Sequence, residues 1–526
     1  MSKLSFNLLF KVSFMKKINL HDNIKFILVF SISVLLFTFS EFNKSNYAHP
    51  KFELAFLILI LIIGIILIQF YSKNKEDIVK ITFITILIFG FLCAFTTPIM
   101  DTPDELYHFY RSELTSEGIL FSSNTNDYID TIGTVDEFNK TVKHEKHGQP
   151  VGFTVFESNT DTSPINISKT DFYMPFMHNS FIGYLPQAIG ILIAKLFDLN
   201  AIWLVWLGRL CNVLFYDILV SYAIKKTPIF KIPISLVATM PMSIYIASSL
   251  SIDATINGLG ILAIAFALYM YKSEKSLEIK DILLFDIIVF LCGTCKITYI
   301  LLIFLVLLIP MSKFKNKKKY LLTIFSSITG VLLIFYLYTC YVSHTINLPT
   351  LEMFFNQSAN TGNSSINTSN SNSLTSKFSI KNLNFLIKSE IFGFYDQCVK
   401  LFTFGWLTYT SQILATFSMI YYGLIGFFYP ENSEINLKYK IISFLVILII
   451  YSATFFAMID YSLYHCPNAT LIQGVQGRYF IPLLSLIPLV FNINKNKRFK
   501  DMDLWIFTVL LIILSSFVML TIVFYY

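Results

Sequence analysis

Charged residues are scarce in this sequence of 526 residues. Asp, Glu, Lys and Arg together make up 14% of the chain, whereas hydrophobic residues make up 55%. A water-soluble fold has too little interior to bury that much apolar surface, so the expected solvent is a lipid bilayer. The net charge of +7 does not indicate a nucleic-acid partner, because the lysines lie in short clusters between apolar runs, where they orient membrane spans.

Cysteine is also scarce, and the seven cysteines are scattered without the paired spacing of a metal site. Cys292 and Cys295 form a C-x-x-C pair in apolar surroundings, and we interpret both as packing residues. The sequence shows no tandem repeat, and its two halves lack the matching interrupted helices of many inverted-repeat transporters. No small-residue cleavage pattern follows Ser40, so the first apolar run is expected to be retained as a helix.

Long apolar runs are abundant instead. Each has about 17 to 22 residues, the length that a helix needs to cross roughly 30 Å of hydrocarbon. Clear examples are residues 24–40, 54–71, 321–341 and 504–525. The predicted fold class is therefore all-α, a single polytopic transmembrane helix bundle over residues 1–526 with about 13 spans.

Lysine clusters predict the orientation of these spans. Under the positive-inside rule all of them are cytoplasmic, and they fall at residues 3–25, 73–80, 225–231, 272–280, 313–319, 438–440 and 495–500. The amino terminus is then cytoplasmic and the carboxyl terminus outside. Two long polar stretches become exterior loops: residues 96–180, with juxtamembrane helices, and residues 342–400, which are Asn/Ser-rich and flexible in part.

Two apolar segments depart from simple spanning. Charge permits only one net crossing between residues 180 and 225, and the weaker candidate, residues 181–197, is predicted to lie at the outer face without spanning. Residues 281–311 are too long for one span and have basic clusters at both ends. They are predicted to form a hairpin whose turn, residues 293–296, presents Lys296 toward the outer face.

The richest polar motif follows the third apolar run. Thr102 with Glu105 matches a capping box and Pro103 suits the first helical position, so a helix is predicted from here to about Gly118. On such a helix Asp104, His108 and Arg111 share one face, which makes a candidate reaction centre. The alternative is that Asp104 and Glu105 only favour the helix dipole, with His108 and Arg111 paired to them.

Other unusual polar residues map to the same side of the membrane. A charge between two apolar spans is costly, so Asp253 is a functional candidate, with a helix N-cap as the alternative. Arg209 and Lys296 suit a lipid phosphate; the alternative for both is a structural pair with Asp217 or with backbone carbonyls. Arg478 suits a pair of phosphate oxygens, or else reaches to lipid headgroups.

A family resemblance rests on these motifs in this order: Thr102-Pro103-Asp104-Glu105 with His108 and Arg111, Leu185-Pro186-Gln187-Ala188 with Gly190, Gly208-Arg209, Ser251-Ile252-Asp253-Ala254, Lys296 with Tyr299, Phe404-Gly405-Trp406, and Gln476-Gly477-Arg478-Tyr479-Phe480 with Pro482. Over roughly residues 80 to 490 the chain resembles the bacterial membrane proteins named domain of unknown function 2142. That family in turn resembles the GT-C glycosyltransferase superfamily, which implies a GT-C-like bundle in the bacterial plasma membrane with its active site facing outside.

The resemblance also implies roles for individual residues. Asp104 is the expected base, with Glu105 or Asp101 as alternates, and His108 orients Asp104 or contacts the acceptor. Substrate binding is expected from Arg111, Arg209, Asp253, Lys296, Trp406, Gln476, Arg478 and Tyr479. The expected partners are a polyprenyl-phosphate sugar donor, a glycan or lipid-linked acceptor and membrane lipid. Some superfamily members hold a divalent metal and others need none, and the sequence leaves both open.

Three other functions remain open at this point. A transporter or flippase for lipid-linked sugars also places charges near the membrane, but the cytoplasmic loops here are short and plain. A surface-polysaccharide polymerase would add whole repeat units instead of single sugars. A non-catalytic scaffold would leave the cell-surface glycan unchanged when Asp104 is replaced.

Trp406 is either an aromatic-belt residue or a sugar-stacking residue.

Overall fold

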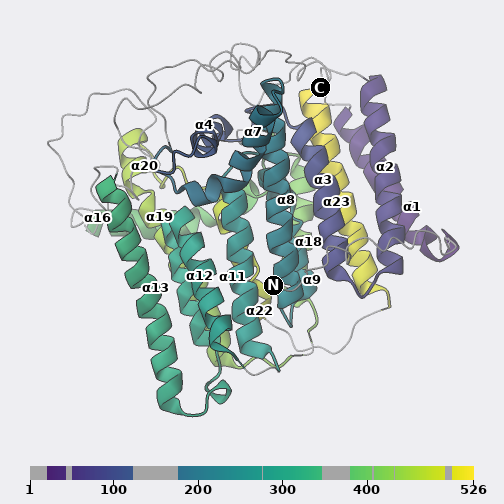
Figure 1. Ribbon diagram of the computed structural model, residues 1–526. Coiled ribbons are helices and arrows are strands. Elements are labelled where there is room, and N and C mark those ends of the chain that lie inside the picture. Colours follow the sequence, from purple (N-terminus) through teal and green to yellow (C-terminus); the bar gives the residue numbers. More distant parts are fainter. Residues whose placement is uncertain are drawn as a thin grey trace.

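The computed structural model describes residues 20–42, 50–121, 176–274, 277–345, 380–405, 408–431, 433–491 and 500–526. Within these residues the chain is almost entirely helical, and the β pairing found there is one isolated bridge between Phe404 and Tyr409. Long helices run side by side from one end of the molecule to the other (Figure 1). The predicted all-α helix bundle is confirmed.

Eight helical segments of the described residues are long and apolar enough to cross a membrane. They are α1 (Leu20–Phe42), α2 (Pro50–Lys73), α3 (Ile78–Thr96), α8 (Ile202–Lys226), α11 (Asp253–Lys272), α13 (Lys317–Thr345), α19 (Leu437–Ala457) together with α20 (Ile459–His465), and α23 (Met502–Tyr525). Three shorter apolar segments are Phe181–Leu196, Ile297–Leu308 and Gln412–Phe428. The structure thus supports many crossings but does not confirm the expected 13.

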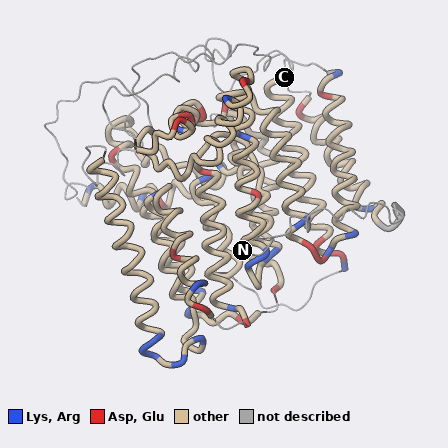
Figure 2. The backbone as a smooth tube through the Cα atoms, viewed as in Figure 1, with Lys and Arg blue, Asp and Glu red and all other residues tan. Residues whose placement is uncertain are grey.

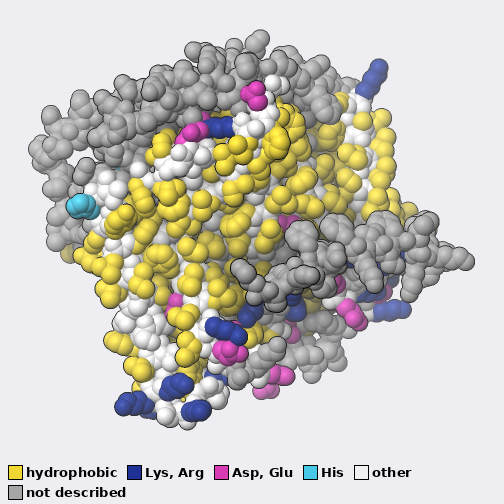
Figure 3. Space-filling view, in the orientation of Figure 1, with side chains coloured by type: hydrophobic (Ala, Val, Ile, Leu, Met, Phe, Trp, Pro, Cys, Tyr) yellow, Lys and Arg dark blue, Asp and Glu magenta, His cyan; other side chains and the backbone are white. Residues whose placement is uncertain are grey.

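Shorter helices lie between or beside these segments. They are α4 (Glu105–Ser116), η2 (Phe181–Tyr184), α7 (Leu185–Leu196), α9 (Lys231–Ala238), α10 (Pro241–Ala247), α12 (Ile279–Cys295), η3 (Ile297–Leu308), η4 (Met311–Lys313), α16 (Ile380–Phe392), α17 (Phe394–Lys400), α18 (Gln412–Phe428), η6 (Gly477–Phe480), α21 (Ile481–Leu484) and α22 (Ile487–Phe491). In the space-filling view a broad band of hydrophobic side chains covers the visible face (Figure 3). A band of that kind is what lipid-facing helices present to hydrocarbon.

Helix α11 lies in the centre of the bundle. Of the residues in its most apolar 18-residue stretch, 94% are buried inside the protein. Glycines let its neighbours approach closely: a Cβ added at Gly258 would lie 2.8 Å from the side chain of Leu219, and one at Gly260 would lie 2.8 Å from Pro482. Small residues serve this purpose in membrane bundles, where packing takes the place of the hydrophobic effect. By contrast, only 22% of the residues in the most apolar 18-residue stretch of α13 are buried, so most of α13 faces outward.

A second close approach fixes α7 against α8 at the end of the molecule that also carries α4 (Figure 1). A Cβ at Gly190 would lie 2.2 Å from the backbone oxygen of Leu207, so only glycine allows the two helices to cross there. The twelve residues of α7 span about 18 Å. By itself α7 is shorter than a complete crossing, but η2 directly precedes it, so the prediction that residues 181–197 do not span stays a prediction.

The predicted hairpin is present. Helix α12 ends at Cys295, Lys296 adopts an extended conformation, and the 3₁₀-helical segment η3 begins at Ile297 and packs against α12. The chain folds back so sharply that a Cβ at Gly293 would lie 2.7 Å from the side chain of Ile300. Lys296 therefore lies in the turn, as predicted.

Candidate functional site at one end of the bundle

Charged side chains are concentrated at the two ends of the bundle. Lysines cluster where α13 begins, and acidic residues gather around α4, toward the opposite end (Figure 2). The candidate site lies at the α4 end. It is assembled from the beginning of α4, the beginning of α11, the turn after α12, and η6.

Asp104 has a backbone conformation that suits a functional residue. Its φ is 62°, in the left-handed region that Asp tolerates better than most residues. The predicted capping box is wrong: α4 begins at Glu105, and no side chain caps it. The carboxylate of Asp104 is thus available, its side chain is 27% exposed, and one oxygen lies 3.7 Å from Nη2 of Arg478.

Arg478 is the central cation of the site and is almost completely buried. Its Nε donates to the carboxylate of Asp253 at 2.9 Å, while its contact with Asp104 is longer than a hydrogen bond. Two carboxylates therefore share one guanidinium. The guanidinium carbon also lies 5.6 Å from the centre of the Tyr479 ring. An oxygen anion that binds Nη2 would therefore compete with Asp104 for the guanidinium.

Lys296 adds a second cation. Its Nζ lies 3.1 Å from the centre of the Tyr479 ring, and among the described residues it forms no ion pair. The hydroxyl of Tyr299 donates to the backbone oxygen of Tyr479 at 2.7 Å and holds this part of η6 in place. Burial lowers the pKa of Lys296 to about 8, while the nearby charge of Asp253 opposes that shift.

Arg209 and Glu105 form a separate, fully buried ion pair. Nε and Nη2 of Arg209 bind the Glu105 carboxylate at 2.8 and 2.6 Å. Its other N–H groups donate at 2.8 to 3.0 Å to the backbone oxygens of Ala94, Thr97 and Pro98. All five donors of the guanidinium are thus used within the protein. We interpret both residues as structural, because neither retains capacity for a substrate.

This pair corrects one alternative from the sequence. Arg209 does use backbone carbonyls, but its acidic partner is Glu105 and not Asp217, which instead accepts a hydrogen bond from Ser221 at 3.2 Å. The Glu105 carboxylate also accepts from the backbone N–H of Leu250 at 3.2 Å. The pair therefore ties the end of α3, the start of α4 and the α10–α11 connection to α8.

His108 and Arg111 are buried and make side-chain hydrogen bonds to other parts of the chain. Nδ1 of His108 lies 2.8 Å from the Tyr184 hydroxyl, and Nε2 lies 3.4 Å from Ser251 Oγ. Burial lowers the pKa of His108 to about 3, so the imidazole is neutral. Arg111 donates to the backbone oxygens of Asn179 at 3.0 Å and Leu120 at 2.8 Å. These contacts join His108 and Arg111 to other parts of the chain, and a shared reaction centre with Asp104 stays a prediction.

The remaining predicted residues have varied surroundings. Asp101 is fully buried and accepts a hydrogen bond from Tyr525, which ties the end of α23 to the site region. Tyr479 follows Arg478 within η6, and Gln476 is the residue directly before η6. Trp406 lies outside the described residues. In the same part of the chain the backbone N–H of Gly405 donates to the Tyr245 hydroxyl at 3.1 Å.

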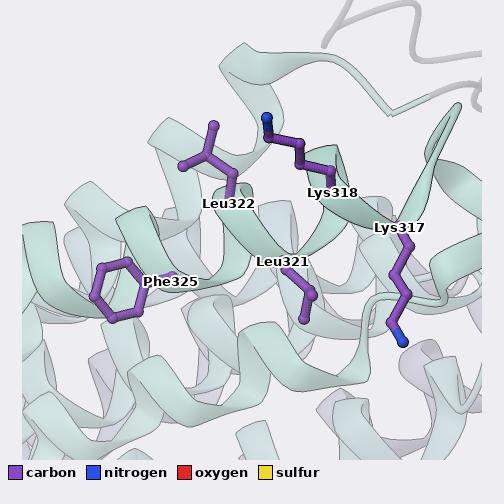
Figure 4. A pocket seen from close by; sticks show the side chains of 5 residues that line it. All are labelled: Lys317, Lys318, Leu321, Leu322 and Phe325. Atoms are coloured by element: carbon purple, nitrogen blue, oxygen red, sulfur yellow. The ribbon is translucent and has the colours of Figure 1, made fainter.

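A narrow crevice, too tight to admit a water molecule, lies beside Arg478. Its walls come from four parts of the chain: Pro103, Met242, Tyr245, Lys400, Thr403, Gly405, Gln476 and Arg478. A second hollow lies far from this site, at the start of α13, between Lys317, Lys318, Leu321, Leu322 and Phe325 (Figure 4). There the two lysines point away from each other, so they do not converge on one ligand.

No group of three or more His, Cys, Asp or Glu side chains within the described residues is arranged to hold a metal ion. The sequence missed Tyr184, Tyr245 and Lys400 as members of the site region. None of the three residues belongs to a recognisable sequence motif. Only the fold brings them near the motifs that contain His108, Gly405 and Arg478.

The geometry of η6 depends on Gly477. A Cβ there would lie 2.1 Å from the backbone oxygen of Gln397, so Gly477→Ala must displace η6 from α17. We expect it to lower the free energy of unfolding by about 1 to 3 kcal/mol and to move Arg478. Thermal unfolding in lipid nanodiscs measures the effect. The matched control is Gly423→Ala in α18, where no atom lies within 4 Å; equal stability of the two variants would contradict the prediction.

A family model described as "Predicted membrane protein (DUF2142)" matches residues 87–490. No curated protein and no solved structure showed a significant match to the chain. The matched range contains every element of the site except the end of α23.

Proposed function

The chain belongs to the family of predicted membrane proteins DUF2142, and we propose that it is a membrane glycosyltransferase. In this proposal it moves a sugar from a polyprenyl-phosphate donor to a cell-envelope or surface-glycan acceptor on the outer face of the bacterial plasma membrane. The supporting observation is the convergence of a partly exposed carboxylate, Asp104, with a buried Arg478 at 3.7 Å. Lys296 supplies a second cation beside the same motif, next to Tyr479.

This combination suits group transfer from a lipid phosphate. The lipid tail of such a donor stays in the bilayer, so its phosphodiester lies where a membrane-end site can reach it. As the acceptor oxygen attacks the anomeric carbon, the bond to the phosphate oxygen breaks and its electron pair leaves with polyprenyl phosphate. Asp104 accepts the acceptor's proton as general base, and Arg478 and Lys296 stabilise the departing phosphate.

Asp253 has a supporting role in this mechanism. Its hydrogen bond to Nε of Arg478, at 2.9 Å, fixes the guanidinium, and its own position is set by the start of α11. Ser251 contributes to that start, since its Oγ accepts from the backbone N–H of Asp253 at 3.2 Å. His108 contacts Ser251, and we assign it a positioning role on that basis.

The direct test uses the purified protein in lipid nanodiscs with polyprenyl-phosphate glucose and methyl glycosides as acceptors. The proposal expects a glycosylated acceptor and free polyprenyl phosphate in equal amounts. The same donor enclosed in liposomes reports on transport. Movement of intact donor across the bilayer without cleavage would overturn the proposal in favour of a flippase.

The pH dependence of transfer is a further prediction. Burial raises the pKa of Asp104 above its usual range, against the opposing effect of Arg478, and Asp104 must be ionised to act as a base. Lys296 must be charged, and its pKa is about 8. The rate should therefore rise through the elevated pKa of Asp104 and fall above about pH 8.

Lys296→Arg separates the two limbs of this profile. Arginine keeps its charge at every accessible pH, so the decline above about pH 8 should disappear while the acid limb stays. Initial rates between pH 4 and 10 measure both variants. A basic limb that is unchanged in Lys296→Arg would show that another group titrates there.

A further inference from the structure

The start of α13 carries positive charge that the protein does not balance. Among the described residues no ion pair is formed by four exposed lysines there: Lys315, Lys317, Lys318 and Lys319. Helix α13 contains no Asp or Glu. At the start of the neighbouring α12, Glu278 is already paired with Lys280, and Asp281 with Lys226. The anion that complements these lysines must therefore come from outside this part of the chain.

Apolar side chains are exposed directly beside the lysines. Leu321, Leu322 and Phe325 are 53%, 65% and 67% exposed. Together with Lys317 and Lys318 they line the open hollow on the surface of α13 (Figure 4). Contact of these carbon surfaces with water is unfavourable, so they need an apolar cover close to the charges. The partner of this surface must therefore be both anionic and apolar.

The length of α13 places the lysines at the level of lipid headgroups. Its 29 residues extend for about 43 Å, whereas the hydrocarbon core of a bilayer is roughly 30 Å thick. The start of α13 extends lower in the view than the neighbouring helices (Figure 1). A lysine has a flexible four-carbon stem, so its ammonium group reaches the headgroups while Leu321 and Leu322, one turn later, stay in hydrocarbon.

The directions of the lysine side chains suit a lipid surface better than one small anion. Lys317 and Lys318 extend to opposite sides of α13 (Figure 4), as expected of consecutive helical residues that lie about 100° apart around the axis. A single phosphate ion cannot bind both. Separate headgroups on the two sides of the helix bind one lysine each, and the attached acyl chains supply the apolar cover.

We propose that the start of α13 is a binding surface for anionic phospholipids. Their phosphate groups contact the four exposed lysines, and their acyl chains cover Leu321, Leu322 and Phe325. This contact fixes the depth in the bilayer of a helix that the rest of the protein holds on one side only, since most of α13 faces outward. The inference goes beyond the proposed sugar transfer and does not depend on it, because α4 and the candidate site lie toward the opposite end of the bundle (Figure 2).

Photo-cross-linking in nanodiscs tests this contact at the site itself. Phosphatidylcholine nanodiscs carry a small fraction of a lipid with a diazirine in its acyl chain, either phosphatidylglycerol or phosphatidylcholine, and mass spectrometry measures the labelling of residues 320–325. The phosphatidylglycerol probe should label the wild type about fivefold more strongly, or better. Lys317→Gln with Lys318→Gln should lower this preference by about fivefold or more, because each lysine near anionic headgroups strengthens binding by about that factor. Lys317→Arg with Lys318→Arg keeps both charges and should stay within about twofold of the wild type.

The matched control is Lys25→Gln with Lys75→Gln, which removes the same number of charges from the protein. Both of these lysines already lie beside Asp501, at 3.7 and 3.3 Å, so the labelling of residues 320–325 should stay unchanged. Equal labelling of the wild type by the two lipids would overturn the proposal and leave the lysines as a surface for a soluble anion. A preference for phosphatidylglycerol that persists in Lys317→Gln with Lys318→Gln would overturn it as well.

Discussion

Replacing Arg209 with methionine is expected to lower the free energy of unfolding by about 3 to 5 kcal/mol, the usual cost of removing one partner of a buried ion pair. The substitution leaves the Glu105 carboxylate charged and without its bidentate partner at full burial. It also leaves the carbonyl groups of Ala94, Thr97 and Pro98 without their donor. Thermal and denaturant unfolding in detergent micelles, together with the yield of folded protein, measures the loss.

A double variant identifies the cause of that loss. In Arg209→Met with Glu105→Met the buried charge is gone, so stability should recover in part, although the three carbonyl groups stay unpaired. The control is Lys280→Met, which removes an exposed cation paired with the exposed Glu278 at 2.9 Å and should leave stability close to that of wild type. A loss in Arg209→Met no larger than in this control would refute the structural role of the pair.

The second large effect concerns Asp104 and falls on rate instead of stability. General-base catalysis contributes roughly 10² to 10⁴-fold, so Asp104→Asn should slow sugar transfer by about that factor. The fold should tolerate the change, because the side chain is 27% exposed and its one ion-pair contact is 3.7 Å long. Asparagine also accepts a positive φ about as readily as aspartate does.

A matched control for this variant exists elsewhere in the chain. Asp198, which follows α7, also has a positive φ, of 49°, and is exposed. Asp198→Asn makes the same chemical change in a similar backbone conformation, away from Arg478. Its transfer rate should equal that of wild type. If both variants lose activity alike, the effect belongs to backbone conformation and not to the carboxylate of Asp104.

The sequence predicted the parts of this structure that depend on local pattern. Apolar runs marked the long helices, and the flanking lysines with Gly293 marked the hairpin that places Lys296 in a turn. Local pattern failed at the start of α4. A capping box contributes only about 1 kcal/mol, and the buried pair of Glu105 with Arg209 takes the side chain away from the cap.

Pairings between distant residues were beyond sequence reasoning. Glu105 and Arg209 are 104 positions apart, and Asp253 and Arg478 are 225 apart. Neither motif indicates its partner in the sequence, because several cationic residues could have paired with each acidic residue. The sequence therefore identified Asp104, Asp253, Lys296 and Arg478 as unusual, but only the fold separates these from the structural pair.

The central claim is that Asp104 removes the acceptor's proton while Arg478 and Lys296 bind the donor phosphate. Its most direct test is single-turnover transfer in nanodiscs, with donor binding measured on the same preparations of wild type and Asp104→Asn. We predict unchanged donor binding and a transfer step slowed by about 10² to 10⁴-fold. Transfer at the wild-type rate by Asp104→Asn, with its donor binding intact, would contradict the account and leave Asp104 as the residue that precedes a helix.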